Sequence, residues 1–331
     1  MSCFFRFART LVLGAGLILA IQTGDAAAQD FPITIEHAFG RTTIPEQPER
    51  VATVAWANHE VPLALGVVPV GFARANFGDD DGNGLLPWVE ERLEELDAKA
   101  PTLFDEGDGI DFEAVAATNP DVILAAYSGL SRADYDILSK IAPVIAYRDG
   151  PWTTDWREMI RLNATGMGMA AEGEALIARI EDEMSKVVAR HPEIEGKTAM
   201  FVTHLEARDL SVIRFYTAND TRVKFLLDLG FDLPRSVREA SADSRYAGEI
   251  SAERIDAFAD VDILIAYGGE ALRDAIQENP LVRHLPAVRN GAVVLLDNDP
   301  VGTAANPTPL SIPWVLEDYV GRLAEAARQA K

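Results

Sequence analysis

The chain has 331 residues, of which 48% are hydrophobic and 25% are charged. This is the composition of a globular protein, and the length suggests about two domains. With 52 Asp and Glu against 30 Lys and Arg, the formal net charge is −22, which disfavours binding to the phosphate backbone of a nucleic acid. The single cysteine excludes a disulfide scaffold and a metal cluster held by cysteines.

The N-terminal segment has the pattern of a secretory signal peptide. Two arginines precede the apolar run Leu11–Ile21, and Ala26–Ala28 supplies small residues for cleavage. The run is about half the roughly 20 residues that a membrane-spanning helix needs. Cys3 lies before this run, so lipid attachment at its thiol is not expected. We therefore predict that residues 1–28 are a cleaved signal peptide and that the mature protein is periplasmic.

Short apolar runs then alternate with helical patterns over the first half of the chain. The predicted strands are Arg50–Ala55, Pro69–Phe72, Val122–Ala126 and Val144–Ala146. The predicted helices between them are Glu60–Leu65, Pro87–Leu96, Phe112–Thr118 and Ala133–Ile141. Such an alternation favours a parallel α/β architecture.

Apolar residues recur at helical spacing from Asp155 to Arg190, which predicts one long helix that Gly166 and Gly168 would allow to bend. Strands are then predicted at Thr198–Thr203, Ser211–Thr217, Val261–Ala266 and Ala292–Leu296, and helices at Arg222–Leu229, Ala252–Phe258 and Leu310–Arg328. We therefore predict an α/β protein of two doubly wound lobes. The N-terminal lobe would span residues 29–152, the linking helix 153–191 and the C-terminal lobe 192–331.

One segment of each predicted lobe has a counterpart in the other. Ile110–Leu124 parallels Ile250–Leu264: each has an N-capping residue, a glutamate in the first turn, a helix and a buried strand. A favourable interaction with the helix dipole explains each glutamate separately, but it does not require the same offset in both halves. We expect Glu113 and Glu253 to occupy equivalent exposed places, one in each lobe.

Sequence signals for catalysis and for a histidine metal site are weak. No two of the five histidines lie three or four residues apart, and neither G-x-S-x-G, a P-loop nor H-E-x-x-H occurs. The segment from Asp79 does fit the spacing of a calcium-binding loop. Its candidate ligands are Asp79, Asp81, Asn83 and Glu90. A solvated acidic turn before a helix that starts at Pro87 explains the same residues.

Arginines and aromatic residues follow the predicted strands, where ligands of doubly wound sheets bind. The candidate cleft residues that follow strands are Trp56, Arg74, Tyr127, Arg148 and Trp152. The second lobe adds Arg214 and Tyr216 on one face of a predicted strand, Arg245 and Tyr246 in the loop before the Glu253 helix, and Asn306 in a Pro-rich loop. Aromatic rings and guanidinium groups suit a large ligand that is partly apolar and partly anionic.

These features resemble the iron-siderophore substrate-binding proteins of ABC importers, a family that includes the ferrichrome-, ferric-enterobactin- and ferric-citrate-binding proteins. The resemblance runs from about residue 33 to the end of the chain. The segments that carry it are His37–Pro45 with Pro48–Val51, Ala64–Gly71, Asp111–Val115 with Asn119–Leu124, Asp134–Val144, Leu285–Gly291 and Leu310–Pro313.

The resemblance implies a binding protein that holds a ferric siderophore between its lobes and needs no cofactor of its own. It implies that arginines and aromatic residues at the cleft positions contact the chelate, and that Glu113 and Glu253 dock onto the permease of an importer driven by its ATPase. Gly107 stands where the ferrichrome binder has an arginine, so that contact does not carry over.

The predicted function is thus capture of a ferric siderophore by a monomeric protein without enzymatic activity. One alternative is a haem or corrinoid in the same cleft, with Tyr127, Tyr246 or His204 as the axial ligand of haem. A secreted hydrolase that uses carboxylates is a further alternative, and a carrier of free metal ions is disfavoured by the scattered histidines.

Overall fold

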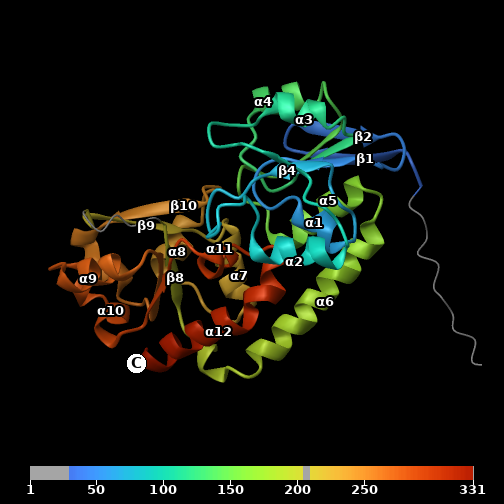
Figure 1. The fold of residues 1–331 in the computed structure, drawn as a ribbon. Coiled ribbons are helices and arrows are strands. Elements are labelled where there is room, and N and C mark those ends of the chain that lie inside the picture. The colour runs from blue at the N-terminus through green and yellow to red at the C-terminus, as the bar shows by residue number, and fades with distance from the viewer. Residues whose placement is uncertain (1–29, 204–208, 331) are drawn as a thin grey trace, which may run out of the picture.

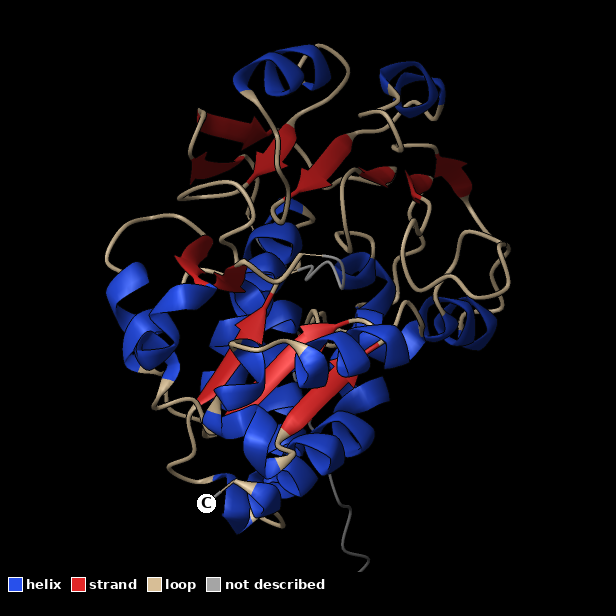
Figure 2. Ribbon diagram, turned by 90° about the vertical axis from the view of Figure 1, so that its left-hand side faces the viewer, coloured by secondary structure: helices blue, strands red, loops and turns tan. Residues whose placement is uncertain are grey.

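The computed structural model describes residues 30–203 and 209–330. They form two α/β lobes connected along one side by a long helix (Figure 1). A view from the side shows the two sheets in separate lobes, one above the other (Figure 2). The predicted signal peptide lies outside the described residues. Within them, no helix is long and apolar enough to cross a membrane.

The N-terminal lobe is built on a five-stranded parallel sheet of order β5-β4-β3-β6-β7. Its strands are β3 (Val51–Thr53), β4 (Gly71–Ala73), β5 (Thr102–Phe104), β6 (Val122–Ala125) and β7 (Val144–Ala146). The helices that connect them are α1 (Glu60–Ala64), α2 (Pro87–Glu95), α3 (Phe112–Ala117) and α4 (Arg132–Leu138). The four strands and four helices predicted for this lobe are confirmed, within a few residues at their ends.

Sequence patterns did not predict three strands of this lobe. The hairpin of β1 (Ile33–His37) and β2 (Gly40–Ile44) pairs antiparallel and alternates buried with exposed residues along β1. It joins the lobe where the Ala38 N–H donates to the Tyr147 carbonyl oxygen over 3.0 Å. β5 is only three residues long and has one fully buried side chain, Phe104, so its apolar signal is weak.

The C-terminal lobe has a mixed sheet of order β10-β9-β8-β11-β12. Its strands are β8 (Ala199–Val202), β9 (Val212–Tyr216), β10 (Ala247–Ser251), β11 (Ile263–Tyr267) and β12 (Val293–Leu296). β8, β11 and β12 are parallel as predicted, but β9 runs antiparallel to both β8 and β10. A parallel crossover takes a dozen or more residues, and only the nine residues 203–211 separate β8 from β9.

Helices surround this second sheet. They are α7 (Thr221–Asp228), α8 (Arg235–Ala240), α9 (Glu270–Glu278), α10 (Pro286–Asn290), α11 (Pro300–Ala304) and α12 (Ser311–Gln329). Three segments are 3₁₀-helices: η1 (Pro192–Ile194), η2 (Ala252–Phe258) and η3 (Val282–His284). The segment predicted as an α-helix at 252–258 is thus η2, and its backbone is kinked at Arg254.

The long helix predicted from Asp155 to Arg190 is two helices, α5 (Trp156–Gly166) and α6 (Ala170–Val188). Gly168 lies between them with a φ of +73°, a left-handed conformation that ends a helix. α5 packs on β1, β6 and β7 and so belongs to the N-terminal lobe, while α6 runs to α12 of the other lobe (Figure 1). The link itself is therefore the 19-residue helix α6.

Buried polar contacts hold the lobes together beside this link. Glu60 of α1 accepts hydrogen bonds from the Thr308 hydroxyl and from the Leu310 N–H over 3.1 Å, both in the C-terminal lobe. Its other oxygen accepts from Trp88 Nε1 over 2.8 Å. The Gly78 N–H donates to Asn298 Oδ1 over 2.7 Å. Hydrogen bonds between the lobes therefore add to the covalent link through α6.

Candidate functional site

A cavity of about 740 Å³ lies between the lobes. The N-terminal lobe contributes the loops that follow its strands, with Trp56 after β3, Arg74 after β4, Glu106 after β5 and Tyr127 after β6. The C-terminal lobe contributes the ends of β9 and β11, the start of α7 and the loop after α11. In parallel sheets the carboxyl ends of the strands form such binding sites.

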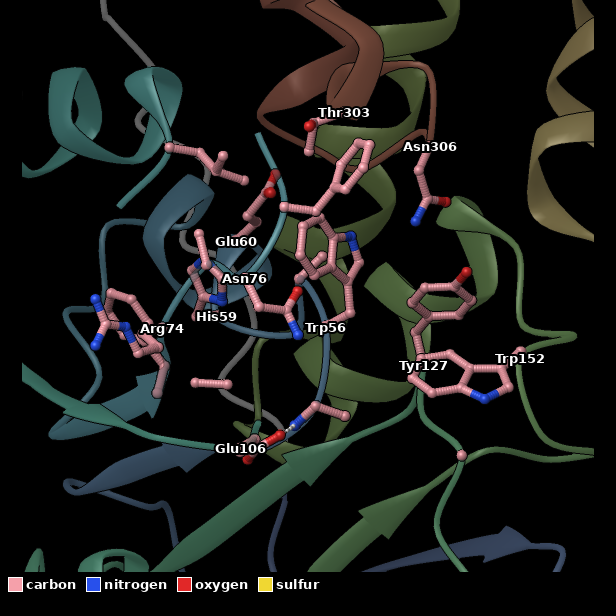
Figure 3. Close-up of a pocket in the computed structure, with 18 of the residues that line it drawn as sticks. Trp56, His59, Glu60, Arg74, Asn76, Glu106, Tyr127, Trp152, Thr303 and Asn306 are labelled. Carbon is pink, nitrogen blue, oxygen red and sulfur yellow. Dashed lines mark hydrogen bonds between the residues drawn. The ribbon is translucent and has the colours of Figure 1, made fainter. Parts of the chain in front are cut away.

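Aromatic rings form much of the wall. Figure 3 shows Trp56 in the middle of the site, with Tyr127 and Trp152 on one side and Arg74 on the other. The rings of Tyr127 and Trp152 meet edge to face at 5.2 Å and 77°. Gly129 allows this position of the indole, because a Cβ there would lie 2.6 Å from Trp152 Nε1. Such rigid rings can cover the apolar parts of a large ligand.

An arginine of the C-terminal lobe is buried in the opposite wall. Arg222 pairs with the Asp220 carboxylate at 3.0 Å, and its Nε donates to the Tyr267 hydroxyl over 3.0 Å. Its guanidinium carbon lies 4.5 Å from the ring centre of Tyr216. Burial raises the pKa of Asp220, although Arg222 partly opposes the shift. The pair presents a guanidinium to the cavity while leaving this wall close to neutral.

Burial also raises the pKa of Tyr127, to about 12. Burial raises the pKa of Tyr216 as well, and for both tyrosines the nearby Arg222 opposes the shift. Both phenols thus remain protonated near neutral pH and act as hydrogen-bonding groups. A raised phenol pKa also disfavours Tyr127 as a phenolate ligand of haem iron, and His204 lies outside the described residues.

Three carboxyl groups of the N-terminal lobe line the cavity, those of Glu60, Glu106 and Asp134, and burial shifts the pKa of the first two. Glu106 Oε2 accepts the Ala55 N–H over 3.0 Å, and its buried Oε1 has no hydrogen-bond partner among the described residues. Burial raises the pKa of Glu106 to about 7, and the nearby Asp111 adds to the shift. Burial likewise raises the pKa of Glu60 to about 7, against the hydrogen bonds that it accepts. Both carboxyls therefore titrate near neutral pH.

His59 and Arg74 complete the polar lining of the N-terminal lobe. The His59 ring stacks on Phe72 with centroids 4.2 Å apart, and burial lowers the pKa of this histidine to about 3, so it is neutral. Arg74 is exposed and makes no salt bridge within the described part of the chain. Its guanidinium is therefore free to meet a ligand.

Seven of the ten predicted cleft residues line this cavity: Trp56, Arg74, Tyr127, Trp152, Tyr216, Tyr246 and Asn306. The structure places the other three, all arginines, outside it in exposed ion pairs. Arg148 pairs with Glu158 at 3.2 Å and Arg214 with Glu249 at 3.2 Å. Arg245 pairs with Asp243 at 2.8 Å. In strand β9, Arg214 is exposed beside Glu249, while Tyr216, two residues further on, is buried.

Four further residues that line the cavity are not predicted by the sequence patterns: Arg222, Asp220, Tyr267 and Glu106. A signal for Arg222 exists in retrospect, because it lies in the first turn of α7, where the helix dipole disfavours a cation. Asp220 caps the same helix by accepting the Arg222 N–H over 2.8 Å. Glu106 follows β5, a strand that the apolar pattern did not reveal, so nothing in the sequence marked it as a residue at a strand end.

The two predicted docking glutamates are both exposed and both lie in the first turn of a helix. Glu113 is the second residue of α3, which Asp111 caps by accepting the Ala114 N–H over 2.9 Å. Glu253 is the second residue of η2, where the Ser251 hydroxyl accepts the Glu253 N–H over 3.3 Å. The placement, one on each lobe, matches the repeat in the sequence.

The acidic loop at Asp79 is closed by its own hydrogen bonds. The two oxygens of the Asp79 carboxylate accept the N–H groups of Gly82 and Gly84, each over 2.8 Å. The Asn83 amide donates to Asp81 over 2.8 Å and to Glu90 over 2.7 Å. These contacts fit the acidic turn before the helix at Pro87, which is the second explanation that the sequence allows for this segment. Among the described residues, no group of three or more His, Cys, Asp or Glu side chains could hold a metal ion.

Comparison with known proteins identifies similar chains. The model of the family described as "Periplasmic binding protein" matches residues 51–300. A crystal structure of PiaA from Streptococcus pneumoniae in complex with ferrichrome is 46% identical, with a TM-score of 0.87, and the match covers 90% of this chain and 100% of PiaA.

Curated relatives are more distant in sequence. The ferric enterobactin-binding periplasmic protein FepB of Escherichia coli is 27% identical over 88% of this chain and 92% of its own length. The putative ABC transporter substrate-binding lipoprotein YhfQ of Bacillus subtilis is 25% identical over 87% of this chain and 90% of its own length.

Proposed function

Because this chain belongs to the periplasmic binding protein family, we propose that it is the solute-binding component of an ABC importer and that its ligand is a ferric siderophore. The observation that carries this proposal is the cavity of about 740 Å³ between the lobes, which is large enough for a ligand of siderophore size. The relative PiaA was crystallised with ferrichrome, and FepB is described as binding ferric enterobactin.

The cavity suits recognition of the outer surface of a chelate. Trp56 and Trp152 offer apolar ring faces from the N-terminal lobe, and Tyr216 offers one from the C-terminal lobe. The unpaired Arg74 and the buried Arg222 can donate charge-assisted hydrogen bonds to the oxygens that chelate iron. The siderophore itself would supply the iron ligands, so the protein needs to bind only the organic shell.

Export and docking complete the proposed role. The signal peptide would direct the protein to the periplasm, where it acts as a monomer. Glu113 and Glu253, exposed on separate lobes, would pair with basic residues of the permease, and the ATPase of the importer would then drive transport. The spacing of the two carboxylates would report that both lobes are correctly placed.

Titration of tryptophan fluorescence with ferric siderophores tests the proposal. Two of the five tryptophans, Trp56 and Trp152, line the cavity, so we expect a saturable quench that is lost in large part in Trp56→Phe. Trp314→Phe is the matched control, because Trp314 lies on α12 beside Trp88 and outside the cavity lining. Haem and cobalamin serve as competing ligands. Saturable binding of either one, with no binding of any ferric siderophore, would contradict the proposal.

A further inference from the structure

The charged groups that line the cavity include more acids than bases. Arg74 and Arg222 are the guanidinium groups among the lining residues, and they face the carboxyl groups of Glu60, Glu106, Asp134 and Asp220. The formal charge of the lining is therefore zero when two carboxyls are protonated and minus two when all four are ionised. The chain as a whole, with a net charge of −22, adds a field of the same sign.

The buried arginine does not provide a surplus positive charge. Arg222 already pairs with Asp220 at 3.0 Å in the wall of the C-terminal lobe. The Asp220 side chain is only 1% exposed and that of Arg222 15%, so water screens this pair little. Arg74 alone is a free cation of the cavity within the described residues, and the carboxyl group of Glu106 lies on the same lobe (Figure 3).

Glu106 has an acceptor oxygen to spare. Its Oε2 is held by the Ala55 N–H, while Oε1 is buried with no hydrogen-bond partner among the described residues. A buried acceptor without a partner is costly, and an anionic ligand beside it would add repulsion. A ligand with an N–H donor, or one without excess negative charge, fits this position.

Ferric chelates differ in charge by class. Three hydroxamate groups carry three negative charges, which balance the three positive charges of Fe³⁺, so the chelate is uncharged. Three catecholate groups carry six negative charges, so their ferric chelate has a net charge of minus three. Resting on the function proposed above, we propose that this cavity selects ferric chelates by charge. It accepts uncharged chelates of the trihydroxamate class and disfavours polyanionic ones, and the Glu106 carboxylate is the residue that sets this preference.

The test uses two tripodal chelators built on one scaffold, one with three hydroxamate arms and one with three catecholate arms. Their ferric complexes are titrated by fluorescence at pH 8, where Glu106 is ionised. We expect the wild-type protein to bind the hydroxamate complex at least about tenfold more tightly. We expect Glu106→Gln, which keeps an oxygen to accept the Ala55 N–H, to reduce that ratio at least about threefold. Arg74→Gln, which removes the free cation, should increase it.

Asp108→Asn is the matched control, since Asp108 is an exposed carboxylate two residues away that does not line the cavity. The ratio of its affinities for the hydroxamate and catecholate complexes should equal that of the wild-type protein. Equal binding of the two complexes by the wild type, or an unchanged ratio in a folded Glu106→Gln variant, would overturn the inference and leave the proposed function intact. Binding of neither complex nor any natural ferric siderophore would instead overturn the proposed function, and the inference with it.

Discussion

Arg222 and Arg214 belong to the same lobe but lie in opposite environments. The Arg222 side chain is 15% exposed and pairs with a buried carboxylate, whereas the Arg214 side chain is 61% exposed and pairs with an exposed one. A buried ion pair that loses one member leaves an uncompensated charge in a medium of low dielectric. An exposed pair loses little, because water and salt already screen it.

We therefore predict that Arg222→Ala lowers the free energy of unfolding by about 3–5 kcal/mol. Arg214→Ala should lower it by less than about 1 kcal/mol. Urea denaturation followed by circular dichroism measures both. Equal effects of the two substitutions would show that Asp220 is not buried with Arg222 in the folded protein.

The break between α5 and α6 separates the N-terminal lobe from α6, the helix that links the two lobes. Two conditions make Gly168 necessary there. Its φ is +73°, and a Cβ at this position would lie 2.6 Å from the ring of Phe31. Gly196, with a φ of +76°, meets only the first condition, because no atom lies within 4 Å of its Cβ position.

Replacement by alanine should destabilise the protein to different extents at these two glycines. Gly196→Ala should destabilise the protein by roughly 1–2 kcal/mol, the conformational cost of a left-handed residue with a side chain. Gly168→Ala should cost more, because the methyl group must also displace Phe31. Thermal unfolding of the two variants measures the difference. A Gly168→Ala variant no less stable than Gly196→Ala would contradict the packing role of this break.

Glu60 is a buried group that connects one lobe to the other, because it accepts hydrogen bonds from Thr308 and Leu310. Burial raises its pKa to about 7 from the ordinary value of 4.5. Between these two pH values the Glu60 carboxyl is protonated in the folded state and ionised in the unfolded state. The contribution of Glu60 to stability is then complete below about pH 4.5 and is lost as the pH rises through 7. The full shift corresponds to roughly 3 kcal/mol.

We therefore predict that the free energy of unfolding falls between pH 5 and pH 8, and that Glu60→Gln makes this fall smaller. Part of the fall should remain, because burial also raises the pKa of Glu106 to about 7. Denaturation at both pH values measures the change, with Glu113→Gln as the control for loss of an exposed carboxylate. A fall as steep in Glu60→Gln as in the wild type would show that Glu60 does not couple protonation to the contact between the lobes.

We expect the two exposed docking glutamates to be needed for transport by the assembled importer. The double variant Glu113→Arg/Glu253→Arg should abolish uptake of the ferric siderophore, since it places positive charges against the basic surface proposed on the permease, and it should leave ligand affinity unchanged. The control reverses the charge of two other exposed glutamates, one in each lobe, Glu36 and Glu278. Uptake by the docking variant at the wild-type rate would refute the docking role.

The alternation of strands and helices, the two-lobed α/β class and seven of the ten cleft residues are predictable from the amino-acid sequence alone. Local patterns suffice for these, because a buried strand and an amphipathic helix each leave an apolar period in the sequence. Because the strands of the N-terminal lobe are parallel, residues that follow them, such as Trp56 and Tyr127, lie at the same edge of the sheet.

Which arginines line the cavity depends on contacts between segments that are far apart in the sequence. Arg148, Arg214 and Arg245 pair with acidic neighbours at the surface, whereas the guanidinium of Arg222 lies among three tyrosines from separate strands and loops. The same holds for Glu60, whose partners Thr308 and Leu310 are about 250 residues away in the chain. Charge and burial at a site between lobes depend on contacts between distant segments, and no local period in the sequence records such contacts.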